Sequence, residues 1–316
     1  MTIGDPRDVL LRARDLRAGG ATTGTLQSAV RRGTLVRVRR GWYCDGALWR
    51  ESDALGRHLL RAAAVSDDGD EPLLFAETAA VVWGIPLLGD PPEDVMVLAA
   101  ASAGGKSEPG VRRSATGWRR APRSRERGLV VTPPARTAVD LACVRGFTAG
   151  VVAMDHLLAR GVPRSEFEGA LMTRTSRYGS AAARTAIAFA DARAESPGES
   201  VARAAFLLLG FEVPDLQVAF RDDDGLMRVD FFWRATRTVG EFDGRLKYTG
   251  GSDTGGADVL WREKLREDRL RRQVDSIVRL TWRDVRSPDR LARLLSAAGV
   301  PRSARGITTA VPVRRR

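Results

Sequence analysis

Arg228–Lys247, with the sequence RVDFFWRATRTVGEFDGRLK, is the stretch around which the rest of the chain is organised. Two β-prone apolar runs, VDFFW and TVGEFD, flank a short polar segment, and this pattern predicts two adjacent strands joined by a turn. The first run carries Asp230, and the second carries Glu241 and Asp243. Since alternate residues of a strand share a face, Glu241 and Asp243 are expected on the same side of the sheet.

Carboxylates gathered on neighbouring strands repel one another and lose hydration unless a cation offsets their charge. A hard divalent cation, Mg²⁺ or Mn²⁺, is the simplest such partner, because these ions prefer carboxylate oxygens as ligands. The alternative is that the acids face solvent and pair with the many arginines of the chain. The sequence therefore predicts a metal site here, with surface ion pairs as the open alternative.

The spacing D-x(10)-E-x-D-G, which starts at Asp230, resembles the PD-(D/E)XK nuclease fold, and it is most similar to the variant of very-short-patch-repair endonucleases. In that fold a helix before the strands carries a further acid. Glu199 holds the matching position, in a helix that Ser196 is expected to cap. The resemblance implies that Glu199, Asp230 and Glu241 are the metal ligands, together with the carbonyl of Phe242, and that the domain hydrolyses phosphodiesters.

The chain departs from the family's simplest pattern, which has a lysine two residues after the glutamate, because that position is Asp243. Its three lysines are Lys106, Lys247 and Lys264, and the last two follow the acids. A lysine near the scissile phosphate can position water and offset charge in the transition state. We expect Lys247, in preference to Lys264, to supply this cation; the alternative is that both lie on the surface. The predicted catalytic residues are Asp230, Glu241, Asp243, Lys247 and Lys264.

Composition favours a polyanionic partner. The chain has 316 residues, a net charge of +12 and an isoelectric point near 10.9, which favours nucleic acid first. The sequence lacks a long apolar run and a signal-peptide core, so we expect a cytoplasmic protein without a membrane partner. Two distant cysteines, Cys44 and Cys143, support neither a disulfide framework nor a cysteine zinc site.

Residues 1–50 are predicted to form a winged helix-turn-helix. We expect a helix over residues 8–18, a second helix in TGTLQSAVRR that ends at Gly33, and a hairpin around Arg40-Gly41 in LVRVRRGWYC. A polar second helix followed by an arginine-rich wing suits a major groove and its flanking phosphates. The predicted contacts to double-stranded DNA are Thr25, Gln27, Ser28, Arg31, Arg32, Arg37, Arg39 and Arg40.

The motif L-x(4)-RRGxLVRVRRGWY is similar to the N-terminal domain of AbiEi-type antitoxins, the regulators of type IV toxin–antitoxin systems. The segment RTAVDLA extends this similarity into residues 51–195, expected as a mixed α/β middle region. Within it Arg136 and Asp140 lie four apart, which predicts a local ion pair. Residues 196–300 then form the nuclease-like domain, and residues 301–316 a basic tail.

The predicted order of elements gives an α/β protein, α+β overall, whose C-terminal domain has a restriction-endonuclease-like mixed sheet flanked by helices. The predicted function is DNA binding combined with Mg²⁺-dependent endonuclease activity on DNA. The alternative is an antitoxin-like transcriptional regulator whose nuclease-like domain does not cut and instead binds a cognate toxin or forms a homodimer. An RNA substrate is also open, and the winged helix alone could serve as a protein-docking module.

Overall fold

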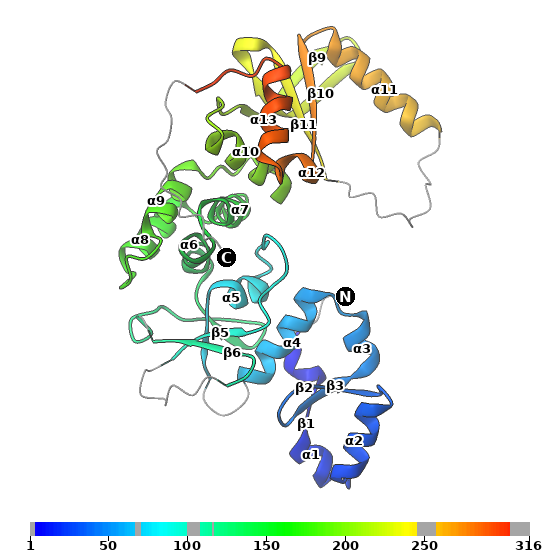
Figure 1. Ribbon diagram of the computed structural model, residues 1–316, viewed down its shortest axis with the longest axis vertical. Helices are drawn as coiled ribbons and strands as arrows, with labels where there is room; N and C mark the ends of the chain where they lie inside the picture. Colours follow the sequence, from blue (N-terminus) through cyan, green and yellow to red (C-terminus); the bar gives the residue numbers. More distant parts are fainter. Residues whose placement is uncertain (1–3, 67–70, 100–107, 116, 245–256, 304–316) are drawn as a thin grey trace. The chain divides into compact units, whose positions relative to one another are not determined.

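The computed structural model describes residues 4–66, 71–99, 108–115, 117–244 and 257–303. The side chains of residues 257–260, 262 and 263 also lie outside the description. The described chain is a mixed α and β protein, which confirms the predicted α+β class (Figure 1). Among its helices, none combines the length and the apolar character that crossing a bilayer requires.

The chain divides into two compact units. The N-terminal unit comprises Met1–Leu157 and Val162–Ala188, and the C-terminal unit comprises Leu158–Gly161 and Phe189–Arg316. The predicted boundary at residue 50 falls inside the N-terminal unit, and the one at residue 195 lies close to Phe189, where the long segment of the C-terminal unit starts. Each unit is described below by itself.

The N-terminal unit begins with the winged helix-turn-helix. Its elements in chain order are the 3-10 helix η1 (Pro6–Val9), β1 (Leu10–Arg12), α1 (Ala13–Ala18), α2 (Thr23–Arg31), β2 (Leu35–Arg39) and β3 (Trp42–Asp45). The strands form an antiparallel sheet in the order β1-β3-β2. Thr22 caps α2 by accepting the N–H of Thr25 at 3.1 Å, and Gly33 and Gly41 take the left-handed turns expected of them.

The helix predicted over residues 8–18 is wrong in its first half. Leu10–Arg12 forms a strand instead, and its residues pair with Trp42–Cys44 of β3. Leu10 is buried in this arrangement. Local spacing favoured a helix, but the backbone hydrogen bonds to a strand more than thirty residues away decide the outcome.

The rest of the N-terminal unit is a five-stranded sheet with helices. Its strands are β4 (Leu73–Leu74), β5 (Val95–Leu98), β6 (Val111–Ser114), β7 (Ser124–Glu126) and β8 (Leu129–Val131), in the order β6-β5-β4-β8-β7. Its helices are α3 (Gly46–Glu51), α4 (Ala54–Ser66), α5 (Ala76–Trp83), α6 (Pro134–Arg145), α7 (Phe147–Leu158), α8 (Arg164–Met172) and α9 (Ser180–Phe189), which ends at the start of the other unit. β4 runs parallel to β8 and antiparallel to β5, so the sheet is mixed.

The winged helix and the middle sheet share one hydrophobic core. Trp42 and Cys44 of the wing belong to the same buried cluster as Leu60 of α4 and Leu74 and Val131 of the sheet. Arg39 adds a polar link, because its guanidinium pairs with Glu108 at 3.2 Å. Residues 1–50 therefore depend on the middle region for the burial of their apolar side chains.

The C-terminal unit is built on a four-stranded mixed sheet. Its elements are α10 (Pro197–Leu208), β9 (Asp215–Asp222), β10 (Gly225–Trp233), η2 (Arg234–Thr236), β11 (Thr238–Asp243), α11 (Ala257–Arg271), β12 (Ser276–Thr281), α12 (Trp282–Val285) and α13 (Pro288–Ala297). The order is β12-β11-β10-β9, and only the β11–β12 pair among these neighbours is parallel. Both strands predicted from the 228–247 stretch are confirmed as β10 and β11.

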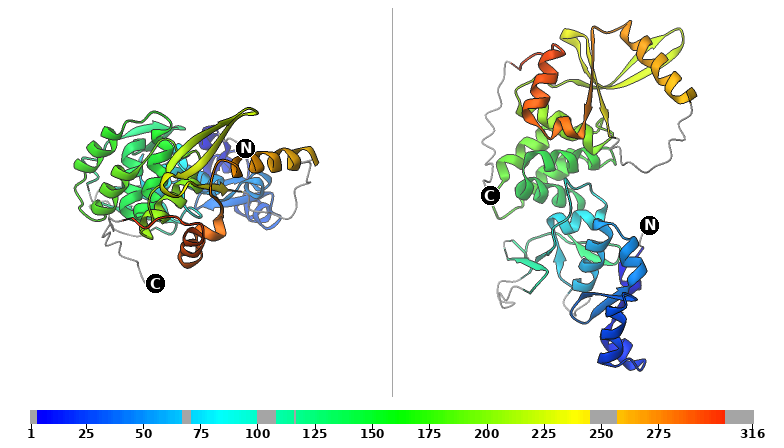
Figure 2. Two further views of the ribbon diagram at one scale, coloured as in Figure 1. Left: turned by 90° about the horizontal axis from the view of Figure 1, so that it is seen from above. Right: turned by 45° about the vertical axis from the view of Figure 1, so that its right-hand side comes forward.

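Helices cover both faces of this sheet (Figures 1 and 2). On one face, Phe206 of α10 packs edge-on against Phe231 of β10, with ring centroids 5.3 Å apart, and α12 and α13 complete that core. On the other face, Leu270 of α11 packs among Met227 and Val229 of β10. This two-sided burial fixes the central strands that carry the acids.

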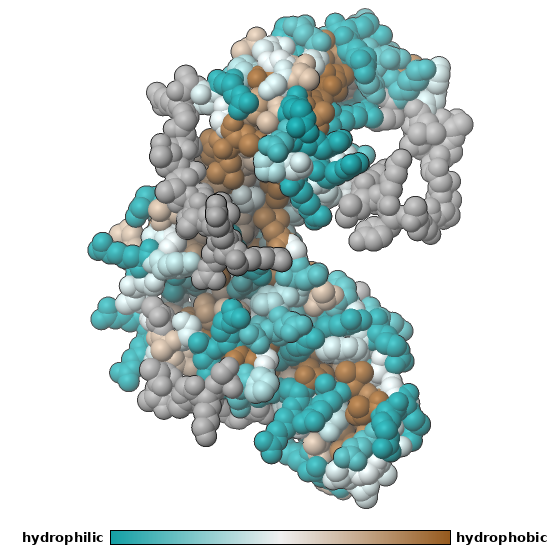
Figure 3. All heavy atoms as spheres, viewed as in Figure 1, coloured by the Kyte–Doolittle hydropathy of each residue, from teal (hydrophilic) through white to brown (hydrophobic). Residues whose placement is uncertain are grey.

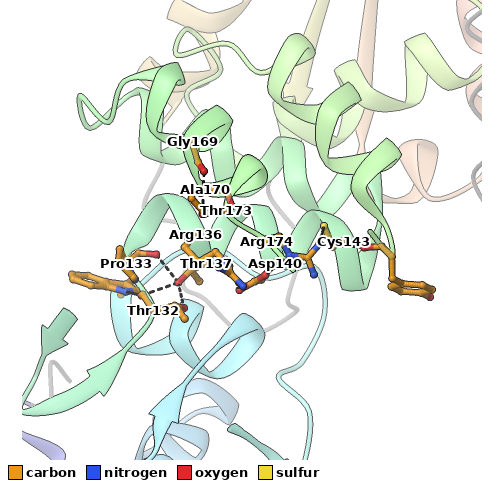
Figure 4. A network of polar contacts seen from close by, with 12 residues as sticks. Thr132, Pro133, Arg136, Thr137, Asp140, Cys143, Gly169, Ala170, Thr173 and Arg174 are labelled. Atoms are coloured by element: carbon orange, nitrogen blue, oxygen red, sulfur yellow. Dashed lines mark hydrogen bonds and ion pairs between the residues drawn. The ribbon is translucent and has the colours of Figure 1, made fainter. Parts of the chain in front are cut away.

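A buried ion-pair network in the N-terminal unit contains the pair predicted from spacing (Figure 4). Nε of Arg136 lies 3.0 Å from Oδ2 of Asp140, which confirms the local pair, and Nε of Arg174, two residues after the end of α8, lies 3.0 Å from Oδ1. The Asp140 side chain is only 3% exposed. Burial raises the pKa of Asp140, and the two guanidinium groups oppose that rise.

We predict that Arg136→Met destabilises the protein by about 3–5 kcal/mol, because Asp140 then stays buried with half of its compensating charge removed. The measurement is the free energy of unfolding from urea titration. The matched control is Arg112→Met, whose guanidinium forms an exposed pair with Asp94 and should change stability by about 1 kcal/mol or less. Equal effects of the two changes would contradict the buried role of Arg136.

His58 of α4 makes stability depend on pH. It is fully buried and its Nε2 lies 2.9 Å from Oγ1 of Thr78. Burial lowers the pKa of His58 from 6.5 to about 4. The unfolded chain therefore binds a proton between these values that the folded chain does not, so stability is lost as the pH falls through this window.

We predict that wild type loses about 2–3 kcal/mol more unfolding free energy than His58→Gln between about pH 7.5 and pH 4.5. Both proteins share all other titrating groups, so the difference between their pH profiles isolates His58. Urea titration at several pH values gives both profiles. Parallel profiles would show that His58 does not contribute.

Candidate metal and nucleic-acid sites

Asp230 lies at an interruption of the β9–β10 ladder. The ladder pairs Val229 with Val218 and then Phe231 with Leu216, and the position between them is skipped. There Gln217 takes a φ of 55°, a left-handed conformation that costs a residue with a side chain about 1–3 kcal/mol. A strained residue in the middle of a strand is an observation that points to a functional position.

The interruption changes which way the strand presents its side chains. Val229 packs with α11 on one face of the sheet, whereas Phe231 and Trp233 pack with α10 on the other. Residues two apart in a regular strand would share a face. At the switch, Oδ2 of Asp230 accepts the N–H of Phe242 in β11 at 2.8 Å. The carboxylate thus joins the two strands beyond their last ladder pair.

Glu199 is held in the first turn of α10 by neutral donors. Its Oε1 accepts from the Ser196 hydroxyl at 2.7 Å, and its Oε2 accepts from the N–H of Glu195 and the Gln217 amide, both at 3.0 Å. Its exposure is 6%. Burial raises the pKa of Glu199, the nearby charge of Asp230 adds to the rise, and the three donors oppose it.

Gly198 lets α10 approach the strand that carries Glu241. A Cβ at this position would lie 2.0 Å from the ring of Phe242, so any larger residue would displace it. Phe242 in turn packs edge-on against Trp282, with centroids 5.3 Å apart. This contact keeps the start of α10, and with it Glu199, beside β11.

Glu241 pairs with an arginine, as the alternative drawn from the sequence allowed, although the sequence did not indicate which arginine. Nη2 of Arg266, from α11, donates to Oε1 of Glu241 at 2.8 Å and to the carbonyl of Arg228 at 2.8 Å. Arg266 lies one turn before Leu270, whose burial fixes this face of α11 on the sheet. In the sequence, the only indication that Arg266 faces the sheet is its spacing of four residues from Leu270. The sequence alone did not show that Leu270 is buried.

The other predicted catalytic residues lie apart from these contacts or outside the description. Asp243 ends β11 and is exposed. Lys264 is exposed on α11, with Nζ 5.9 Å from the ring centroid of Trp261. Lys247 lies outside the described residues, as do residues 304–316 of the predicted basic tail.

A magnesium-type cation would have only a small set of carboxylate donors among the described residues. No group of three or more His, Cys, Asp or Glu side chains that could hold a metal occurs within the described residues. Among the described residues, Asp230 accepts its hydrogen bond through Oδ2 and Glu241 through Oε1. Oδ1 of Asp230 and Oε2 of Glu241 are then the oxygens that a cation would use. Mg²⁺ is commonly bound by one or two carboxylates plus waters and substrate phosphate. Asp230 and Glu241 would hold such an ion, and Glu199 would act beside them.

The predicted DNA contacts of the winged helix differ in their surroundings. Most are exposed: Thr25, Gln27, Arg31, Arg32, Arg37 and Arg40. Ser28 is partly buried and accepts from Nη1 of Arg32 at 2.6 Å. Arg39 is directed into the N-terminal unit, where it pairs with Glu108 and also donates to the carbonyl of Ala64 at 3.4 Å.

Comparison with known proteins gives relatives without a described activity. No family model matches the chain. "Uncharacterized protein Rv2248" of Mycobacterium tuberculosis strain H37Rv is 31% identical over 274 residues, which cover 86% of this chain and 94% of the relative. "Uncharacterized protein MT2308" of strain CDC 1551 gives the same values. Among solved structures, the RV2827C protein of M. tuberculosis is 18% identical, with a TM-score of 0.35, over 63% of this chain and 77% of that one; this likeness is too low to carry an argument.

Proposed function

The chain belongs to the family of the uncharacterized M. tuberculosis protein Rv2248, and we propose that it is a DNA-binding protein whose C-terminal unit hydrolyses DNA phosphodiesters with Mg²⁺ or Mn²⁺. The observation that carries this proposal is that, within the described ranges, the hydrogen bonds of Asp230 and Glu199 at the break in the sheet come from neutral donors and not from cations. The charge of Asp230 adds to the rise in the pKa of Glu199, so the two carboxylates lie near each other.

Two other buried acids of the same chain have arginine partners. Asp140 pairs with two arginines, and Glu77, which is also buried, pairs with Arg145 at 2.6 Å. The neutral donors around Asp230 and Glu199 orient the carboxylates but leave their negative charge in place. A retained negative potential of this kind favours a bound divalent cation.

Each residue then has a role that follows from its contacts. Asp230 and Glu241 would hold the cation, and Glu199 adds negative potential while fixing Gln217. A bound Mg²⁺ would offset charge on the phosphate and lower the pKa of the attacking water. Arg266 lies beside Glu241, where a guanidinium can stabilise charge that develops on the phosphate oxygens.

We predict that the full chain cleaves plasmid DNA with Mg²⁺ or Mn²⁺, and that Asp230→Asn lowers the rate by about 100-fold or more. Asparagine keeps an oxygen that can accept the Phe242 N–H but removes the charge. The control is Asp224→Asn, an exposed acid in the turn of the same hairpin, which should cleave like wild type. Absence of cleavage with either cation, or an unaffected Asp230→Asn, would refute the nuclease assignment.

We predict that Arg266→Gln lowers the cleavage rate by about 100-fold while Mn²⁺ binding stays within about threefold of wild type or becomes tighter. The substitution removes a cation from the proposed phosphate site. It also removes the guanidinium that competes with the metal ion for Glu241. Isothermal titration measures the Mn²⁺ affinity. Arg271→Gln, whose guanidinium pairs with Glu267 on the same helix, serves as the control and should alter neither value. A loss of Mn²⁺ binding in Arg266→Gln would contradict this role.

A second candidate function is a DNA-binding regulator of the antitoxin type whose C-terminal unit does not cut. The pairing of Arg266 with Glu241 favours it, because the guanidinium already neutralises one of the two proposed ligands. The C-terminal unit would then bind a partner protein or a second copy of the chain. DNA binding by the purified protein without cleavage in Mg²⁺ or Mn²⁺ would select this function.

A further inference from the structure

A groove in the N-terminal unit is lined mainly by arginines. It lies between the start of α1, the turn of the wing and the end of α4, and its volume is about 600 Å³. Hydrophilic side chains also dominate the visible face of these N-terminal elements (Figure 3). The guanidinium groups that line it belong to Arg7, Arg12, Arg14, Arg17 and Arg40.

The positive charge of this groove is only partly balanced. Its lining acid, Glu71, is paired with Arg125, and one of its arginines, Arg7, is paired with Asp5 at 2.6 Å. Arg14 pairs with its neighbour Asp15, but both side chains are largely exposed, so this pair contributes little. Among the described residues, Arg17 and Arg40 have no ion-pair partner. Like charges gathered around one groove repel each other, and a bound anion relieves that repulsion.

A neighbouring groove shows that arginine content alone does not create such a site. It is lined by Arg37, Arg39, Arg40 and Arg61, but Glu93 and Glu108 line it as well. Glu108 pairs with Arg39 and lies 3.4 Å from Arg113. Two acids of its own lining therefore offset part of its charge. The groove at α1 differs because its lining acid, Glu71, pairs with Arg125, which is not one of the residues that line the groove.

We propose that the groove at α1 binds the phosphate backbone of a nucleic-acid strand, through Arg14, Arg17 and Arg40. This inference rests on the proposed DNA binding and adds α1 to the contacts predicted for α2 and the wing. Arg40 and Gly41 link the two regions, since they form the turn of the wing and also line the groove. Nucleic acid fits better than a lipid surface, because the lining residues include no exposed large apolar side chain that could enter a bilayer.

The test measures the affinity of the full chain for a labelled DNA duplex between about 50 and 200 mM salt. Each phosphate contact contributes about 0.9 to the slope of log affinity against log salt. We expect Arg14→Ser/Arg17→Ser to reduce the slope by about 1 to 2 and the affinity at 150 mM salt by about 10-fold. The control is Arg112→Ser/Arg113→Ser, which removes the same charge from β6, where both arginines have acidic partners.

The outcomes separate this inference from the proposed function. If wild type binds the duplex with a steep salt slope and Arg14→Ser/Arg17→Ser keeps that slope, the groove inference is overturned and DNA binding stands. If wild type shows no salt-dependent binding, DNA binding fails and the inference fails with it. Binding to phosphatidylserine vesicles that only this double variant loses, with its DNA slope intact, would assign the groove to a lipid surface and overturn the nucleic-acid assignment.

Discussion

The hydrogen bond from the Phe242 N–H to the Asp230 carboxylate is the contact on which the C-terminal unit depends most. It joins β10 and β11 where their backbone pairing ends, and at this point the side chains of β10 switch from one face of the sheet to the other. Because of that change, Phe231 and Trp233 enter the α10 core while Val229 stays with α11. The same break orients Gln217 toward Glu199. One interruption of the sheet therefore serves both packing and the grouping of acids.

Sequence reasoning succeeded where the signal was local. Apolar runs located both central strands, two glycines marked the end of the second helix and the turn of the wing, and the four-residue spacing of Arg136 and Asp140 indicated their pair. It failed where distant segments decide the outcome. Leu10–Arg12 forms a strand because β3 is available to pair with it, and the shared core of wing and middle sheet has no marker in either segment.

In the candidate site, too, local signals were visible in the sequence and contacts between distant segments were not. Glu199, Asp230 and Glu241 could be named as candidates from residue type and spacing, because their motif resembles a known one. Arg266 could not, since it reaches Glu241 only through the packing of α11 on the sheet. The predicted cations were the rare lysines Lys247 and Lys264, and that prediction stays open because Lys247 lies outside the described residues; among the described residues, the cation that pairs with Glu241 is Arg266. An arginine differs chemically, because it keeps its charge under all accessible conditions and presents several donors at once.

The common core of the wing and the middle sheet has a consequence for recognition. Trp42 and Cys44 are buried with Leu74, and Arg39 is tied to Glu108, so the wing cannot reorient without disturbing the sheet behind it. On a duplex bound by this winged helix, the adjustment of shape must then come from the DNA. Base steps that bend or narrow a groove at low cost would be preferred, including steps that no side chain touches.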